Sequence, residues 1–325
     1  MKASALAPGK VILTGEHFVV YGEPALVMAI NRYVRVTVEQ RFDSAIYISS
    51  NLASGLFTGS SFRPDRGGVE SQRILDPIRI AAEATLNNLG EPRGLNIEVT
   101  STLPVAVGLG SSAATAVSTV AAVGRLLGAN LTEESIIDLS TEAERYIHVN
   151  PSGIDQSISV CGGVLSYRRS EGIRPIKITS PIPLIISNTR ISRNTGKLVD
   201  DVRKRVERFP ALMQPLIDVA GKLTLQAIAA LDKGDLDELG LLMDLNHGLL
   251  TTLGVSTVLL DRLVYAAKRG GALGAKLTGA GGGGCIIALS RFEDMETVSQ
   301  SISEAGGVPI IAENVDEGVH SWLVE

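Results

Sequence analysis

The chain has 325 residues, of which 45% are hydrophobic and 20% charged, and it contains 34 glycines. Because a single hydrophobic core typically serves roughly 100–150 residues, we expect two packed lobes, and the composition excludes a disordered chain and a disulfide scaffold. Thirty Lys and Arg residues against 35 Asp and Glu give a net charge of −5. This balance lacks the basic excess of nucleic-acid binders, so no nucleic-acid partner is expected.

Cysteine content and hydropathy indicate a cytoplasmic protein. The two cysteines, Cys161 and Cys285, lie in glycine-flanked apolar runs and lack metal-knuckle spacing, which predicts buried reduced thiols. No targeting segment is visible at the N-terminus. The longest apolar stretch, residues 113–127, is interrupted by polar residues and is shorter than the ~20 residues of a membrane span, so no membrane partner is expected.

The first half of the chain is rich in strand patterns. β-Branched or alternating runs predict strands over residues 6–13, 26–30, 33–40, 45–50 and 95–100. Residues 51–72 show little periodicity and predict a surface loop. Helical spacing predicts helices over residues 75–89, 113–127 and from Thr132 to about residue 149. Asn150 and Pro151 are typical of the cap and first position of a further short helix that carries Asp155.

The second half is dominated by helices between short strands. The patterns predict strands over residues 183–188, 275–278, 285–289 and 309–312, and helices over residues 197–208, 212–231, 235–250, 256–269 and 293–304. This order predicts an α+β fold. The prolines at 175, 181 and 183 place a boundary near residue 180, which divides the chain into domains 1–180 and 181–325.

The loop at residues 104–113, Pro-Val-Ala-Val-Gly-Leu-Gly-Ser-Ser-Ala, is the strongest local signal. Its glycines let the backbone approach an anion, and the helix that follows offers unpaired N–H groups and a positive dipole end. Ser111 and Ser112 could cap that helix or reach a phosphate or a magnesium ion. The alternative is an ordinary glycine loop with a serine cap. The loop is not a Walker sequence, because no Gly-Lys-Ser/Thr follows the glycines.

A second glycine-rich loop, residues 278–285, lies between two apolar runs. Four consecutive glycines are costly to order, so stability alone explains them poorly. A backbone cradle around a ligand is one explanation, and a hairpin bulge is the other.

Charged residues near these loops point to proton or metal chemistry. Lys10 lies beside an apolar strand, Glu144 lies at the edge of the buried face of its helix, and Asp155 lies in the helix after residue 151. Two carboxylates at separate helix ends could hold a metal ion and accept a hydroxyl proton. Surface carboxylates are the alternative, and these residues alone leave it open.

Three separated motifs, residues 7–21, 104–113 and 276–285, occur in the order found in the GHMP small-molecule kinases, and the sequence resembles that family. Residues 15–22, 147–155 and 192–195 make it most similar to the members that phosphorylate mevalonate. The resemblance implies a two-lobed α+β architecture, with an N-terminal lobe like the second domain of ribosomal protein S5 and a ferredoxin-like C-terminal lobe.

The resemblance also implies roles for individual residues. Asp155 would take the proton of the substrate hydroxyl, and Lys10 would stabilise that aspartate and the developing alkoxide. Ser112 and Glu144 would hold Mg²⁺ against the phosphates of ATP. The implied ATP-binding residues are Pro104, Gly108, Leu109, Gly110, Ser111, Ser112 and Ala113. The implied mevalonate-binding residues are Glu16, His17, Arg193, Thr195, Gly281 and Gly282.

The expected function is therefore ATP-dependent phosphorylation of mevalonate to 5-phosphomevalonate in isoprenoid biosynthesis, with a homodimer left possible. The alternatives are a kinase of the same family that acts on phosphomevalonate or on another hydroxyl of mevalonate, and a non-catalytic nucleotide-binding regulator. A phosphorylated substrate would need further basic residues near the motifs, and the sequence shows no such cluster. A regulator should have lost Lys10 or Asp155, and both are present.

Overall fold

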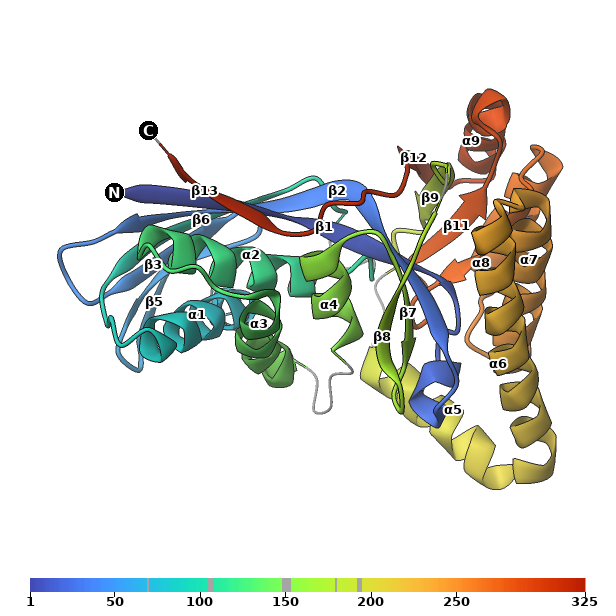
Figure 1. The fold of residues 1–325 in the computed structure, drawn as a ribbon, viewed down its shortest axis with the longest axis horizontal. Helices are drawn as coiled ribbons and strands as arrows, with labels where there is room; N and C mark the ends of the chain where they lie inside the picture. The colour runs from blue at the N-terminus through green and yellow to red at the C-terminus, as the bar shows by residue number, and fades with distance from the viewer. Residues whose placement is uncertain (69, 105–107, 148–152, 179, 192–194, 325) are drawn as a thin grey trace.

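The computed structural model describes the whole chain except residues 69, 105–107, 148–152, 179, 192–194 and 325. It contains two β-sheets, each packed against helices (Figure 1). This is the α+β architecture that the sequence predicts. No helix among the described residues is long and apolar enough to cross a bilayer.

The larger sheet has the strand order β13-β1-β2-β6-β3-β4-β5, and a hairpin of β7 and β8 pairs with one end of β2. Its strands are β1 (Lys2–Thr14), β2 (Ala25–Gln40), β3 (Ile46–Ser50), β4 (Ser54–Thr58), β5 (Ser61–Arg66), β6 (Leu95–Ser101), β7 (Val164–Arg168), β8 (Gly172–Ile176) and β13 (His320–Val324). The 3₁₀ helix η1 (Phe18–Tyr21) connects β1 to β2. The sequence patterns do not predict β7, β8 or β13.

One long strand, β2, replaces the two strands that the sequence predicts on either side of residues 31–32. The register between β1 and β2 shifts between Pro8 and Gly9, and the shift leaves Asn31 and Arg32 as a bulge in β2. Proline has no N–H to donate to the ladder, so an irregularity is expected beside it. The polar dipeptide therefore marks a bulge and not a strand end.

The predicted surface loop over residues 51–72 is wrong. This segment forms β4 and β5, which pair as a hairpin, and then begins helix α1 (Ser71–Asn88). The rings of Phe57 and Phe62 pack across the hairpin with their centroids 4.6 Å apart. Because β5 is an exposed edge strand made mostly of polar residues and a proline, it leaves no alternating apolar pattern in the sequence.

Helices of the N-terminal half cover one face of the larger sheet (Figure 1). They are α1, α2 (Ser111–Leu126), α3 (Glu133–Ile147) and α4 (Ile154–Cys161). α2 packs against β1, β2, α1 and α3, and most of its residues are small and buried. Alanine, serine and glycine allow this close approach on several sides, so α2 is a central helix whose N-terminus is held in a fixed place.

The smaller sheet is antiparallel and has the order β10-β11-β9-β12. Its strands are β9 (Leu184–Asn188), β10 (Gly274–Thr278), β11 (Cys285–Leu289) and β12 (Val308–Ala312). The helices of this half are α5 (Thr195–Arg208), α6 (Pro210–Lys233), α7 (Leu236–Thr252), α8 (Val258–Arg269) and α9 (Met295–Glu304), with the 3₁₀ helix η2 (Phe292–Asp294) before α9. Of these, α7, α8 and α9 pack directly on the sheet.

The two sheets are joined at both ends of the C-terminal half. The chain passes from the larger to the smaller sheet between β8 and β9, close to residue 180, and returns when β13 pairs with β1. Both termini therefore lie at the same end of the larger sheet (Figure 1). At the opposite end of β1, residues of β1 contact β10, and this contact places parts of both halves around one cavity.

Candidate active site

A cavity of about 560 Å³ lies where the end of β1 meets the turn after β10. Most of the residues that the sequence singles out line it: Lys10, Glu16, His17, Gly108, Gly110, Ser111, Ser112, Ala113, Glu144, Asp155 and Thr195. They come from β1, the turn between β1 and η1, the loop before α2, and the ends of α2, α3, α4 and α5. The fold thus gathers side chains that lie up to 185 positions apart in the sequence.

An ion pair joins Lys10 and Asp155 at one side of this cavity. Nζ of Lys10 lies 2.9 Å from Oδ1 of Asp155. The lysine comes from the interior of β1 and its side chain is 5% exposed, whereas Asp155, in the first turn of α4, is 36% exposed. The carboxylate therefore has a fixed cation on one side and open space on the other, which suits a group that must meet a substrate proton.

The loop before α2 lines the cavity with Gly108 and Gly110. Gly110 is the N-cap of α2 and has φ 73°. A Cβ at this position would lie 2.8 Å from Cγ of Lys10, so the loop can approach the lysine only with glycine there. The backbone N–H of Lys10 donates to the carbonyl oxygen of Leu109 at 2.9 Å, which ties the loop to β1.

Ser111 and Ser112 begin α2 and line the cavity. The first N–H groups of a helix have no partner within the helix, and the dipole adds positive potential there, so this end suits a phosphate. Leu109 is buried in the core, and neither Leu109 nor Pro104 is among the described residues that line the cavity.

Glu144 lies near the end of α3, close to the ion pair. Burial raises the pKa of Glu144 to about 7, and the charge of Asp155 adds to this effect. Lys10 and a hydrogen bond with Ser112 act in the opposite direction on the same pKa. Two carboxylates and a hydroxyl therefore converge at this side of the cavity, and the repulsion between the two carboxylates favours a bound cation.

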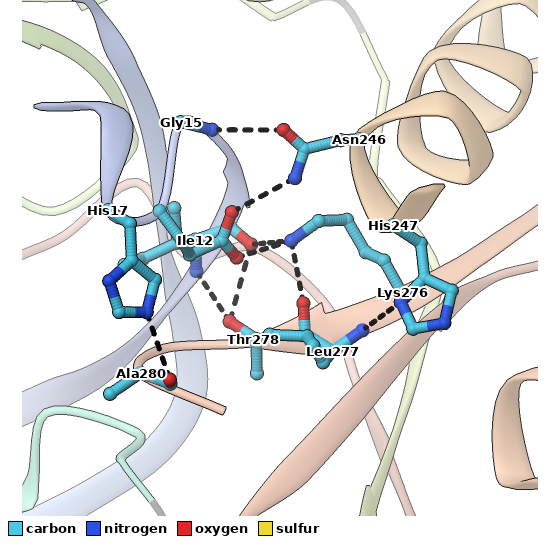
Figure 2. Close-up of polar contacts among 10 residues, drawn as sticks. Ile12, Gly15, His17, Asn246, His247, Lys276, Leu277, Thr278 and Ala280 are labelled. Carbon is cyan, nitrogen blue, oxygen red and sulfur yellow. Dashed lines mark hydrogen bonds and ion pairs between the residues drawn. The ribbon is translucent and has the colours of Figure 1, made fainter. Parts of the chain in front are cut away.

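The opposite side of the cavity is built where the two halves meet (Figure 2). The Nε2–H of His17 donates to the carbonyl oxygen of Ala280 at 2.9 Å. Glu16 is buried and forms an ion pair with Lys276 of β10. Thr195, the first residue of α5, also lines the cavity. Polar groups from both halves thus surround the space beside Asp155.

Two other predicted substrate residues lie behind this surface. Gly281 and Gly282 are not among the described residues that line the cavity; Gly279 and Ala280 are. The N–H of Gly282 donates to the carbonyl oxygen of Val255 at 2.7 Å. The turn therefore packs at Gly282 against the segment between α7 and α8. This contact holds Gly279 and Ala280, at the start of the turn, beside the cavity.

Some predictions fall on residues outside the described part of the chain. Arg193 is one, and the capping roles of Asn150 and Pro151 are others. Among the described residues, α4 begins at Ile154 with Gly153 as its N-cap.

A second cavity, of about 450 Å³, adjoins the first at Ser111 and Ser112. Its walls include Leu52, Ile74, Pro77, Ile78, Val99, Leu103 and Tyr146, with polar groups from Asn51 and Ser101. Because these residues come from β6, the turn after β3, α1 and α3 without a shared motif, no signal in the sequence indicates this cavity.

Lys276 and Asn246 are further polar residues near the cavity, and no pattern in the sequence assigns them a role. Lys276 belongs to the third motif, but its partner Glu16 lies 260 positions away. Asn246 lies on α7 in a run of helix with no recognisable pattern.

Comparison with known proteins gives consistent matches along the chain. The model of the GHMP kinases N terminal domain matches residues 76–163, and that of the GHMP kinases C terminal domain matches residues 227–308. Mevalonate kinase of Pyrococcus horikoshii is 41% identical over 327 residues, which cover 97% of this chain and 96% of that protein. Mevalonate kinase of Aeropyrum pernix is 36% identical, with 97% of each chain covered.

Solved structures agree. The crystal structure of L. major mevalonate kinase in complex with R-mevalonate matches with a TM-score of 0.83 and 29% identity, covering 96% of each chain. That of the Methanococcus jannaschii mevalonate kinase matches with a TM-score of 0.82 and 27% identity, covering 96% of this chain and 98% of the other.

Proposed function

We propose that the Lys10–Asp155 pair and the N-terminus of α2 form the catalytic centre of this protein. The chain belongs to the GHMP kinase family and catalyses the ATP-dependent phosphorylation of mevalonate. The observation that carries the proposal is the Lys10–Asp155 ion pair, which lines the same cavity as the N-terminus of α2. A proton acceptor and a phosphate-binding helix end are the two parts that phosphoryl transfer to an alcohol requires.

The nucleotide lies across the two cavities. The apolar walls of the second cavity suit the flat face of a purine base, and its junction with the first cavity at Ser111 and Ser112 directs the phosphates toward the start of α2. Backbone N–H groups of the loop and of the first turn of α2 bind the phosphate oxygens. The γ-phosphate then lies on the side of the cavity that contains Asp155.

Magnesium fits the oxygen groups beside the phosphates. Ser112 and Glu144 would hold the ion, because hydroxyl and carboxylate oxygens are ligands that Mg²⁺ prefers, and it commonly uses one or two carboxylates together with substrate phosphates. When bound, Mg²⁺ neutralises charge on the β- and γ-phosphates. The raised pKa of Glu144, caused by burial and by Asp155, agrees with a site built for a cation.

Asp155 accepts the proton of the primary hydroxyl of mevalonate. As that proton moves to the carboxylate, the hydroxyl oxygen forms a bond to the γ-phosphorus, and the bond from phosphorus to the bridging oxygen of ADP breaks. Lys10 holds Asp155 in place at 2.9 Å and offsets negative charge as the oxygen becomes more alkoxide-like. The product is the 5-phosphate of mevalonate.

The acceptor lies between Asp155 and the residues where the two halves meet. Glu16 can accept from its hydroxyl groups, and His17 and Thr195 offer polar contacts to its hydroxyl and carboxylate groups. The carboxylate of mevalonate calls for a cation, and Arg193, outside the described residues, stays the predicted one. The division into residues 1–180 and 181–325 and a homodimeric state also stay predictions.

A coupled ADP-release assay tests the proposal. Mevalonate, phosphomevalonate, galactose and homoserine are compared as acceptors, with Asp155→Asn as the control for turnover at this site. We expect turnover selective for mevalonate and dependent on Mg²⁺. Equal or greater turnover with another acceptor would contradict the assignment of the acceptor pocket.

A further inference from the structure

A buried network of polar groups fastens the end of β1 to the smaller sheet (Figure 2). The ammonium group of Lys276 donates to Oε1 of Glu16 and to the carbonyl oxygens of Ile12, at 3.3 Å, and Leu277, at 2.7 Å. A neutral amine has two protons to donate, so three acceptors require the charged ammonium form. Burial raises the pKa of Glu16, while the charge of Lys276 and its hydrogen bond act in the opposite direction and favour the carboxylate.

Asn246 of α7 completes this network. Its Nδ2 donates to Oε2 of Glu16 at 3.3 Å, and its Oδ1 accepts from the backbone N–H of Gly15 at 3.4 Å. One side chain thus holds both the carboxylate of Glu16 and the backbone just before it. Thr278 adds a third link, because its hydroxyl accepts from the N–H of Ile12 at 3.1 Å.

The burial of this network and its position beside the cavity indicate a role in the active site. The side chains of Lys276 and Glu16 are 0% and 1% exposed, and burying such a pair gives little net stability compared with apolar packing. The cavity reaches Glu16 but not Lys276 or Asn246 among its described lining residues. A carboxylate accepts about four hydrogen bonds, and these two partners leave some of that capacity for the cavity.

We propose that Lys276 and Asn246 are positioning residues for the acceptor: they hold the Glu16 carboxylate charged and oriented so that it accepts a hydrogen bond from an acceptor hydroxyl. The same negative charge repels the carboxylate of the acceptor and so directs that end of the molecule away from Glu16. This inference rests on the proposed placement of the acceptor beside Glu16.

Steady-state kinetics with Asn246→Ala test the inference. We expect KM for mevalonate to rise about tenfold, the cost of one hydrogen bond to a charged group, while kcat and KM for ATP stay near wild type. In a Glu16→Gln background the same substitution should change KM for mevalonate by less than about twofold, because Asn246 acts through Glu16.

Asp244→Ala is the matched control. Asp244 lies two positions earlier on α7 and accepts from the backbone N–H of Ala275 at 2.8 Å, so its loss also removes a contact between α7 and β10 without touching Glu16. We expect a lower Tm and an unchanged KM for mevalonate. If Asn246→Ala does not fold, Asn246→Asp serves the test, since a second carboxylate beside Glu16 should raise KM further.

The outcomes separate this inference from the proposed function. A wild-type protein that fails to phosphorylate mevalonate would overturn the proposed function. With an active wild type, an unchanged KM in Asn246→Ala would overturn the positioning role. Equal effects of Asn246→Ala in the wild-type and Glu16→Gln backgrounds would do the same.

Discussion

The two ion pairs of the active site differ in how far water can reach them. Asp155 keeps 36% of its side chain exposed beside Lys10, whereas Glu16 and Lys276 are buried and donate or accept hydrogen bonds within the protein. A group that must exchange a proton needs access to the substrate, and a group that only orients the substrate benefits from being locked. We infer that the first pair performs chemistry and the second fixes geometry.

Lys276→Met should break the second pair with the largest effect on stability. The substitution leaves the Glu16 carboxylate buried without its cation, which we expect to cost about 3–5 kcal/mol of unfolding free energy. Urea and thermal unfolding measure the loss. Adding Glu16→Gln removes the uncompensated charge and should restore most of the stability.

Lys268→Met is the matched control for this prediction. Lys268 pairs with Asp244 at 2.7 Å, but about a third of each side chain is exposed. Because exposed pairs contribute little, we expect a loss of about 1 kcal/mol or less. A similar loss in both lysine variants would contradict the contrast between buried and exposed pairs.

Asp155→Asn should break the first pair with the largest effect on turnover. The amide keeps the shape of the side chain but no longer takes the proton, so we expect kcat to fall about 100-fold or more. Thermal unfolding should show a small change, and nucleotide binding should persist. A near-normal kcat would show that another group accepts the proton.

Gly110→Ala should displace Lys10 and so disturb the reacting side, the part of the cavity that contains Lys10 and Asp155. The new Cβ would lie 2.8 Å from Cγ of Lys10 at a backbone φ of 73°, so we expect the lysine to shift and kcat to fall about tenfold. Gly128→Ala is the control, because it has the same φ and no atom within 4 Å of the added Cβ. It should lower Tm slightly and leave kcat unchanged; equal kcat losses would contradict the steric explanation.

Ser112→Ala and Glu144→Gln test whether the two side chains hold the same metal ion. If both oxygens hold one ion, each substitution should lower activity about tenfold, and the double variant should lose clearly less than the product of the two. The measurement is activity against Mg²⁺ concentration at fixed ATP. Strict multiplication of the two losses would mean that the side chains act independently.

The residues of the reacting side can be picked out in the sequence because they lie in short local motifs. The structure brings them to one cavity, and their roles stay predictions. The glycines before α2, the serines that begin it and the lysine of β1 lie in short motifs, each confined to a single turn or strand. On the opposite side of the cavity, the loop residues that line it near β10 are Gly279 and Ala280, whereas the predicted Gly281 and Gly282 are not among its described lining residues. A glycine run shows that the backbone turns tightly, but not which peptide faces the ligand.

The orienting side, which consists of Glu16, Lys276 and Asn246, could not be predicted from local motifs. Glu16 and Lys276 lie 260 positions apart, and Asn246 lies in a helix with no pattern that marks it. Similar reasons explain the errors in the fold. The polar edge strand β5 has no alternating apolar pattern, and β13 is recognisable only from its pairing with β1 at the far end of the chain.

Single-turnover rapid-quench measurement of phosphoryl transfer, at saturating ATP and over a range of mevalonate concentrations, tests the central contrast most directly. We expect Asp155→Asn to be slow, by about 100-fold or more, even at saturating mevalonate. Asn246→Ala should reach the wild-type rate once mevalonate is saturating. A normal saturated rate in Asp155→Asn, or a slow one in Asn246→Ala, would contradict the division between the reacting and the orienting pair.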